Sequence, residues 1–173
     1  MNSQSKNLIA YLSSEFEIHL ESIVLIKLVY LGELEAIEKH GKRFTDLTFI
    51  HYRHGPYSSE LQNFHESNES FPFNPENKDL DLLDVAESIV NKWKPIVLGG
   101  GIQGLINKTY HTLPFQETPY GEKIDFEKYI GNKYISETVV NKQKYKQLSN
   151  PNVKIYLNKE LQSSVDEFLE QFN

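Results

Sequence analysis

Two histidines three residues apart, His51 and His54, are the first side chains in this sequence whose type and spacing suggest chemistry. Imidazole rings bind metal ions and transfer protons near neutral pH. A pair with this spacing faces one ligand when it stands on a helix, but Pro56 follows and pushes the backbone before it towards extended angles. In an extended chain, residues three apart point to opposite faces. The pattern therefore predicts no metal site: one ring packs or hydrogen-bonds at the turn, and the other faces solvent.

A run of glycines, Gly99-x-Gly101-x-x-Gly104, matches the dinucleotide-binding pattern, and Asp125 follows at about the right distance. The pattern binds a cofactor only where the glycines join a strand to a helix inside a βαβ unit. Here the apolar residues before the glycines recur at helical spacing as far as Trp93, which indicates a helix. We therefore expect a connection between two helices and no cofactor.

A hydroxyl nucleophile needs a base beside it, and Ser58 next to Tyr57 and His54 is the one cluster of this kind. It lacks the glycine pattern of a nucleophile elbow, and helix capping explains it better. The sequence contains no cysteine, which excludes thiol chemistry and fits a cytoplasmic protein. We therefore expect no enzymatic activity. The alternative is a metal- or nucleotide-dependent enzyme, or a small-ligand binder, that uses His51, His54 and His111 or the glycine run.

Acidic residues outnumber basic ones, and the net charge is −6. A protein that binds nucleic acid or an anionic membrane needs a concentrated basic surface, which this sequence lacks. The most apolar run, residues 23–31, contains Lys27 and is far shorter than the ~20 residues that span a bilayer. Residues 1–16 do not have the basic-then-apolar order of a signal peptide. We therefore expect a cytoplasmic protein that binds no membrane and, by itself, no nucleic acid.

Helical periodicity recurs along the chain and accounts for most of its apolar residues. The run 19–38 is apolar nearly all round, which indicates a central, covered helix, and His40-Gly41 ends it. The short run 44–52 is β-branched and aromatic, which indicates one strand or a short hairpin arm. The other expected elements are helices at 8–16, 59–65, 81–94, 102–111 and 158–172, a short strand at 153–157, and loops at 66–78 and 112–124.

Glycine and proline set two of the expected boundaries. Gly55 permits any backbone angle, while Pro56 fixes φ and removes a donor, so we expect a sharp turn at 54–57 that continues neither a strand nor a helix. Ser59 and Gln62 then have capping-box spacing and begin a helix. Pro95 is expected to end the helix that begins near residue 81.

Together these elements predict a mainly α (α+β) fold. We expect one compact helical domain over residues 1–173, built around the buried central helix and containing a small antiparallel β element. The amphipathic run at 158–172 either packs on this domain's own core or docks in a partner's groove.

Several short motifs follow one another in a set order: Ile26-Lys27-Leu28-Val29-Tyr30-Leu31, His40-Gly41, Thr45-Asp46-Leu47, His54-Gly55-Pro56-Tyr57-Ser58 before Glu60-Leu61, Tyr110-His111-Thr112, Pro114-Phe115 and Thr118-Pro119-Tyr120-Gly121. This order resembles the Panacea domain, the SocA-like family of bacterial and phage antitoxins. The likeness is strongest over residues 20–64 and weaker over 80–126. Residues 127–173 add a C-terminal strand and helix outside it.

The resemblance implies a mainly helical antitoxin that neutralises a cognate toxin, either by direct binding or by delivering the toxin to a Clp-type protease. It supplies no catalytic residues. We expect a toxin encoded nearby, and a partner-binding surface formed by His54, Gly55, Pro56, Tyr57 and Ser58. Some relatives have an added DNA-binding region, and we expect none here. A further alternative is a phage or mobile-element regulator that binds a host protein.

Overall fold

The computed structural model describes residues 1–16, 20–67, 70–71, 73, 79–132 and 135–136. The chain divides into two units, residues 1–139 and 140–173, and every described residue belongs to the first. The strand expected at 153–157 and the helix expected at 158–172 lie outside the described residues. Both stay predictions, as does the single domain expected for residues 1–173.

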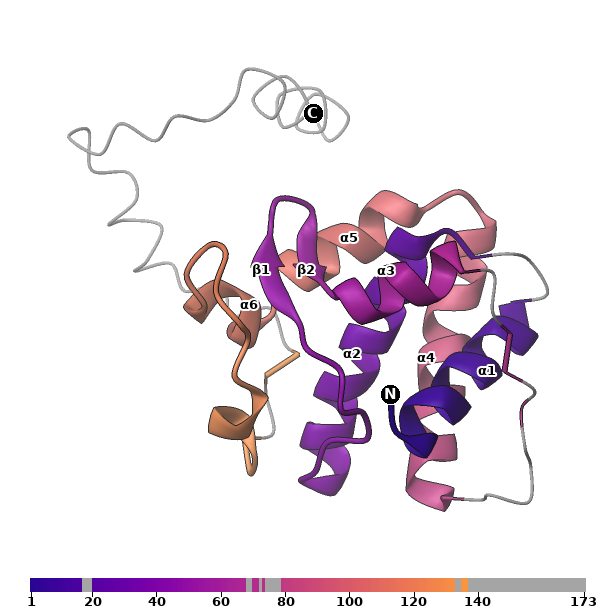
Figure 1. The fold of residues 1–173 in the computed structure, drawn as a ribbon, viewed down its shortest axis with the longest axis horizontal. Coiled ribbons are helices and arrows are strands. Elements are labelled where there is room, and N and C mark those ends of the chain that lie inside the picture. The colour runs from indigo at the N-terminus through magenta and orange to yellow at the C-terminus, as the bar shows by residue number, and fades with distance from the viewer. Residues whose placement is uncertain (17–19, 68–69, 72, 74–78, 133–134, 137–173) are drawn as a thin grey trace, which may run out of the picture. The chain divides into compact units, whose positions relative to one another are not determined.

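Helices make up most of the first unit, and the predicted mainly helical fold with a small antiparallel β element is confirmed (Figure 1). The helix α2 lies at its centre, between the hairpin on one side and α1 and α4 on the other. The elements that pack most extensively on α2 are α1 (Ser3–Phe16), α3 (Ser59–Glu66), α4 (Leu80–Leu98), α5 (Ile102–Tyr110) and strand β2 (Gly55–Tyr57).

The helix α2 (Ser22–His40) is covered on all sides because its sequence is apolar on nearly all sides. Residues 24–34 are buried without exception. An apolar surface on every face has to be covered on every face, which accounts for the central position that the sequence predicted. Gly41 ends the helix with a left-handed φ of 65°, and its N–H donates to the Ile37 carbonyl, also as predicted.

The two longest helices pack with opposite directions, so the end of α2 meets the start of α4. Lys39 Nζ lies 3.1 Å from Asp84, and Lys42 Nζ lies 2.8 Å from Asp81. Basic residues at a helix C-terminus and acidic residues at a helix N-terminus also suit the helix dipoles. Exposed ion pairs are screened by solvent, so these pairs help to fix which ends meet and add little stability.

The chain between α2 and the first strand forms no β-ladder, so the strand predicted at 44–52 is shorter than expected. The N–H groups of Phe44 and Thr45 donate to the Glu33 carboxylate, at 3.3 and 2.6 Å. A backbone donor that is bonded to a side chain does not pair with a strand. The strand β1 is therefore limited to Ile50–Tyr52.

Glu33 holds the segment at Phe44 and Thr45 from inside the core. Its carboxylate also accepts a hydrogen bond from Arg43 Nε at 2.8 Å, and Arg43 donates in turn to the Leu47 carbonyl at 2.7 Å. Burial raises the pKa of Glu33, while the Arg43 guanidinium and the Thr45 N–H act in the opposite direction. Removing either partner of such a buried pair leaves an uncompensated charge, which costs about 3–5 kcal/mol.

The strands β1 and β2 form an antiparallel hairpin whose loop consists of Arg53 and His54. The sequence prediction that residues 54–57 continue no strand is wrong, because Gly55–Tyr57 is the second strand. The sharp change of direction falls two residues earlier than expected. It comes at the loop, and Gly55 follows with a φ of 86°.

The helix α3 begins at Ser59 as expected, but the predicted capping box is wrong. The N-cap is Ser58, and its side chain makes no capping hydrogen bond. Instead the hydroxyls of Ser58 and Ser59 donate to the Glu60 carboxylate, at 3.0 and 3.3 Å, and Gln62 donates to Glu66 at 2.7 Å. A nearby carboxylate is a stronger acceptor for these donors than a neutral group, and a carboxylate in the first turn suits the helix N-terminus.

The helix α4 continues through Pro95 to Leu98, so the stop predicted at Pro95 is wrong. Pro95 is exposed, whereas Val97 beyond it is buried in the core, and that burial keeps the last turn in place. The glycine run ends the helix instead. The N–H of Gly100 donates to Val97 at 3.1 Å, and that of Gly101 donates to Ile96 at 2.8 Å. These are the two bonds of a Schellman motif.

The segment predicted as a loop at 112–124 contains the short helix α6 (Leu113–Glu117). Pro114 stands in its first turn, where the missing proline N–H costs nothing. The chain then runs beside β1, where the Ile124 N–H donates to the Phe49 carbonyl at 2.8 Å. A 3₁₀ turn, η1 (Phe126–Tyr129), follows, with Phe126 and Tyr129 buried in the core.

Candidate partner-binding site

The pairing of the hairpin explains how β2 accommodates a proline. His51 lies opposite Pro56. The His51 N–H donates to Glu122 at 2.9 Å, and the His51 carbonyl accepts from Gly121 at 2.8 Å, so both groups face away from β2. Alternate pairs of an antiparallel ladder exchange hydrogen bonds, and His51 with Pro56 is a pair that does not. Pro56 thus stands where its partner strand needs no N–H.

The carbonyl of Pro56 also faces away from β1, and Lys27 of α2 binds it. The Lys27 Nζ donates to this oxygen at 2.8 Å, and the lysine is only 2% exposed. The outer edge of β2 is thereby closed at Pro56, while the segment at Gly121 and Glu122 closes the outer edge of β1 at His51. A partner therefore cannot extend this sheet by adding a strand at the central pair.

Gly55 lies between α2 and α5 with no room for a side chain. A Cβ built on it would lie 2.8 Å from Thr109 Oγ1 and 3.1 Å from Lys27 Nζ. Its φ of 86° is also a conformation that favours glycine. Burial lowers the pKa of Lys27 to about 8. The hairpin is thus packed against two helices, and the tip is tied down by Tyr110, whose hydroxyl donates to the Arg53 carbonyl at 2.8 Å.

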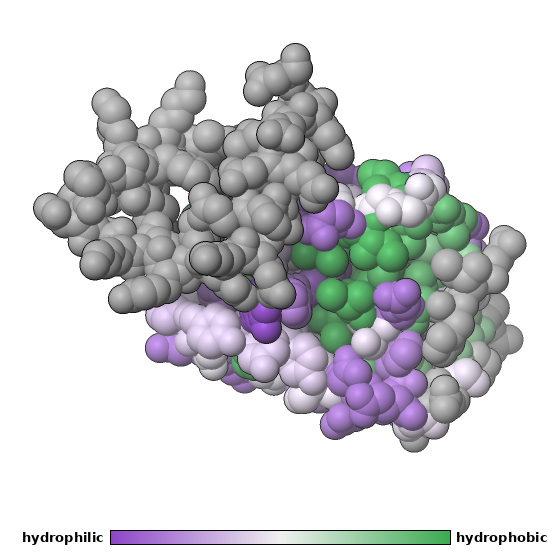
Figure 2. Space-filling view, turned by 90° about the horizontal axis from the view of Figure 1, so that it is seen from above, coloured by the Kyte–Doolittle hydropathy of each residue, from purple (hydrophilic) through white to green (hydrophobic). Residues whose placement is uncertain are grey.

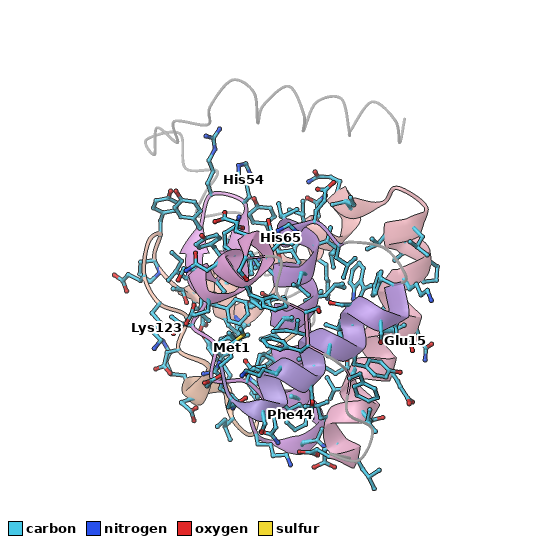
Figure 3. The ribbon with its side chains drawn as sticks, turned by 45° about the vertical axis from the view of Figure 1, so that its right-hand side comes forward. Met1, Glu15, Phe44, His54, His65 and Lys123 are labelled. Carbon is cyan, nitrogen blue, oxygen red and sulfur yellow. The ribbon has the colours of Figure 1, made fainter. Side chains whose placement is uncertain are left out.

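The five residues predicted to bind a partner lie together on this hairpin, but they differ in exposure. His54 is exposed at the tip (Figure 3), and Tyr57 is half-buried. Gly55, Pro56 and Ser58 are buried. These three support the surface without presenting side chains on it. Their assignment to a binding surface stays a prediction.

Sequence reasoning missed the two most exposed aromatic rings of the site. Tyr52 is 47% exposed and Tyr120 is 66% exposed, and their rings stack with an interplanar angle of 16°. Tyr57 packs against Tyr52 with ring centroids 5.6 Å apart. Tyr52 lies two residues before the motif that begins at His54, so its place at the end of the expected strand was the available signal. Tyr120 is distant in the sequence, and only the fold brings it here.

His51 connects this exposed layer to the interior. Its ring lies 3.9 Å from that of Phe115 and 5.9 Å from that of Tyr120, centroid to centroid. Its Nδ1 is 2.6 Å from the Thr118 carbonyl, which fits donation by that nitrogen. The prediction that one histidine packs and hydrogen-bonds while the other faces solvent is confirmed, with His51 as the first and His54 as the second.

The part of the chain that forms the hairpin also matches a known family. Residues 25–92 match the family model Antitoxin SocA-like, Panacea domain. The resemblance drawn from the sequence is thereby confirmed, and it supports a role in a toxin–antitoxin system in general. No curated protein and no solved structure gives a significant match.

The Panacea segment runs from α2 across the hairpin and α3 into α4. It therefore contains Lys27, which binds the hairpin, and Glu33, which binds the segment before it; both are buried. It also contains Tyr52, one of the two exposed rings. Tyr120 and the late motifs at 110–121 lie beyond the matched residues. The exposed pair of rings thus combines Tyr52, inside the matched residues, with Tyr120, beyond them.

The alternative functions relied on the set His51, His54 and His111 as a metal site, or on the glycine run as a cofactor site. Within the described residues, no three His, Asp or Glu side chains come close enough to hold a metal ion. The glycine run joins α4 to α5, so the element directly before it is a helix and not a strand. Of the described helices, none is long and apolar enough to cross a membrane.

Proposed function

We propose that this chain is an antitoxin that acts in the cytoplasm by binding its cognate toxin directly through the end of the hairpin. The proposed surface, here called the hairpin end, consists of Tyr52, Arg53, His54, Tyr57 and Tyr120. The observation that supports it best is the exposed stack of Tyr52 on Tyr120. Tyrosine and arginine are frequent in the centres of protein interfaces, and tyrosine buries a large area for few rotatable bonds.

Rigidity is the second argument for this surface. The hairpin end rests on hydrogen bonds from Lys27 to Pro56, from Tyr110 to Arg53 and between His51 and Thr118. A surface that is already ordered loses less conformational entropy on binding. Because the sheet edges are closed at their central pair, recognition falls to side chains and not to strand addition.

The test is the affinity of the purified chain for the product of its neighbouring gene. We expect Tyr52→Ala and Tyr120→Ala each to weaken binding by roughly tenfold or more, since exposed aromatic anchors typically contribute 1–2 kcal/mol or more. Leu80→Ala is the matched control, because Leu80 is 73% exposed at the start of α4, away from the hairpin. Circular dichroism checks that all three variants are folded.

Cell growth and toxin abundance separate the possible mechanisms. Direct neutralisation predicts that the chain restores growth, that the tyrosine variants fail to, and that the amount of toxin stays constant on an immunoblot. Toxin loss that depends on a Clp-type protease would instead indicate delivery for proteolysis. A neighbouring product that is harmless and binds nothing would contradict the antitoxin proposal, and capture of a host protein by the hairpin end would favour the phage-regulator alternative.

A further inference from the structure

A second exposed surface lies at the opposite end of α5 from the hairpin. It is formed by Ile96 and Leu98 of α4, the glycine turn 99–101, and Ile102 of α5; we call it the α4–α5 corner. Ile96 is 39% exposed and Leu98 is 50% exposed. Seen from above, apolar residues gather there into one continuous area (Figure 2). The hairpin instead contacts Tyr110, the last residue of α5.

The charge around this corner is opposite in sign to that of the whole chain. Lys92 and Lys94 precede Ile96 and Leu98 by four residues each, so each lysine is the neighbour of an exposed apolar side chain one turn along α4. From residue 88 to residue 116 the sequence contains lysines but no Asp or Glu, although the net charge of the chain is −6.

We propose that the α4–α5 corner docks an acidic amphipathic helix of a partner protein. The apolar stripe of such a helix would cover Ile96 and Leu98, and carboxylates beside the stripe would face Lys92 and Lys94. The glycine turn presents backbone without side chains, so the docked helix approaches closely there.

The same charges disfavour the other occupants of an apolar surface. A second copy related by a two-fold axis would place each lysine pair against its own equivalent. An anionic bilayer would attract the corner but repel a chain whose net charge is −6. The proposal does not depend on the toxin or on the hairpin end, so it is tested separately.

Two designed helical peptides of about 18 residues, five turns, serve as probes. They share one stripe of Leu and Phe and differ only in having Glu or Lys beside it. Fluorescence anisotropy with the full chain should show that the acidic peptide binds roughly tenfold more tightly than its basic twin, and that salt weakens this binding. Leu98→Gln should weaken it by roughly tenfold, whereas Leu80→Gln, the same change at the other end of α4, should have no effect.

Reversing the charge of the two lysines is the most discriminating part of the experiment. The double variant Lys92→Glu, Lys94→Glu should prefer the basic peptide, and a merely structural role of the two lysines would not produce that reversal. Three results would overturn the proposal: equal binding of both peptides or no binding, self-association of the chain that Leu98→Gln abolishes in sedimentation, or binding to phosphatidylglycerol vesicles that the same variant abolishes.

Discussion

Lys27 shows most directly how one residue of the central helix acts on the proposed surface. Its ammonium group is buried, and its described acceptor is a neutral carbonyl, that of Pro56. Burying an ammonium group without a paired carboxylate is costly, and a neutral donor would satisfy the carbonyl at lower cost. The sequence marked Lys27 only as a charge within an apolar run. A charged residue in a helix that is apolar on every side was the signal that it must be buried and bonded.

The pKa of Lys27 predicts an increase in stability at alkaline pH. The pKa is about 8 in the folded chain against 10.5 for a free lysine, so the unfolded chain binds more protons between these values. The free energy of unfolding should therefore rise as pH increases through this window, by on the order of 2–3 kcal/mol between pH 7 and pH 10. Urea unfolding at both pH values measures this change.

Lys27→Met is the control for that pH dependence. Other groups titrate in the same range, since burial also raises the pKa of Tyr30 and Tyr110, which lowers folded-state stability at high pH. The variant keeps those tyrosines and lacks the lysine, so the difference between the two chains isolates Lys27. Parallel pH curves for both chains would show that the Lys27 ammonium is not destabilised in the folded state.

Gly55 is predicted to be intolerant of any side chain. Gly55→Ala places a Cβ 2.8 Å from Thr109 Oγ1 at a backbone angle that disfavours alanine, and we expect a loss of about 3 kcal/mol or more. Gly104→Ala is the matched control, because Gly104 is exposed in α5 and nothing lies within 4 Å of the place a Cβ would take there. That variant should gain up to about 1 kcal/mol from helix propensity. Equal denaturation midpoints for the two variants would contradict the packing described at Gly55.

At the scale of elements, most helices and the presence of a small β element were predictable, but the bounds of the two strands were not. Helical spacing of apolar residues located α1, α2, α4 and α5, because each buries one face or all of them. Periodic spacing could not locate the two strands of the hairpin, because each strand has only three residues and one contains Pro56. Its strands depend on Lys27 and on the segment at Gly121, which are distant in the sequence. Residues 44–49 failed as a strand because side chains accept most of their N–H groups. Glu33 accepts those of Phe44 and Thr45, and Glu60 accepts that of Thr48.

Replacing Pro95 tests how far the burial of Val97 outweighs the helix-breaking effect of the proline in α4. The proline leaves the carbonyl of Asn91 without its helical donor and crowds the turn before it. Pro95→Ala should restore that hydrogen bond and raise the free energy of unfolding by about 2 kcal/mol, less than the full interior-proline cost because the unfolded chain gains entropy. Chemical denaturation measures it. An unchanged or lower stability would show that the helix is distorted at this turn to suit the proline.

At the scale of the whole molecule, charge is unevenly distributed. The chain has a net charge of −6, yet the α4–α5 corner is basic and the hairpin end contains Arg53. Two separate surfaces of different chemistry would allow one molecule to hold two partners, as an antitoxin that also delivers its toxin must. The peptide and toxin experiments determine independently whether each surface is used.

The net negative charge leads to a prediction about the rate of toxin binding. Long-range attraction raises association rates between oppositely charged proteins and is screened by salt, with a Debye length of about 10 Å at 0.1 M and 3 Å at 1 M. If the toxin is basic, as expected for an acidic antitoxin, the association rate constant should fall by about tenfold or more between low and high salt, while dissociation changes less. Stopped-flow mixing at a series of salt concentrations measures both rates.

A charge variant remote from the hairpin separates this field effect from direct contact. Glu87 and Glu127 are exposed on α4 and η1, outside the hairpin end. Reversing both to Lys changes the net charge by +4, from −6 to −2. The double variant should associate several-fold more slowly at low salt and match the wild-type rate at high salt, where the field is screened. An association rate that changes neither with salt concentration nor with this charge reversal would exclude steering by the acidic surface. The contacts of Tyr52 and Tyr120 would then be the source of affinity.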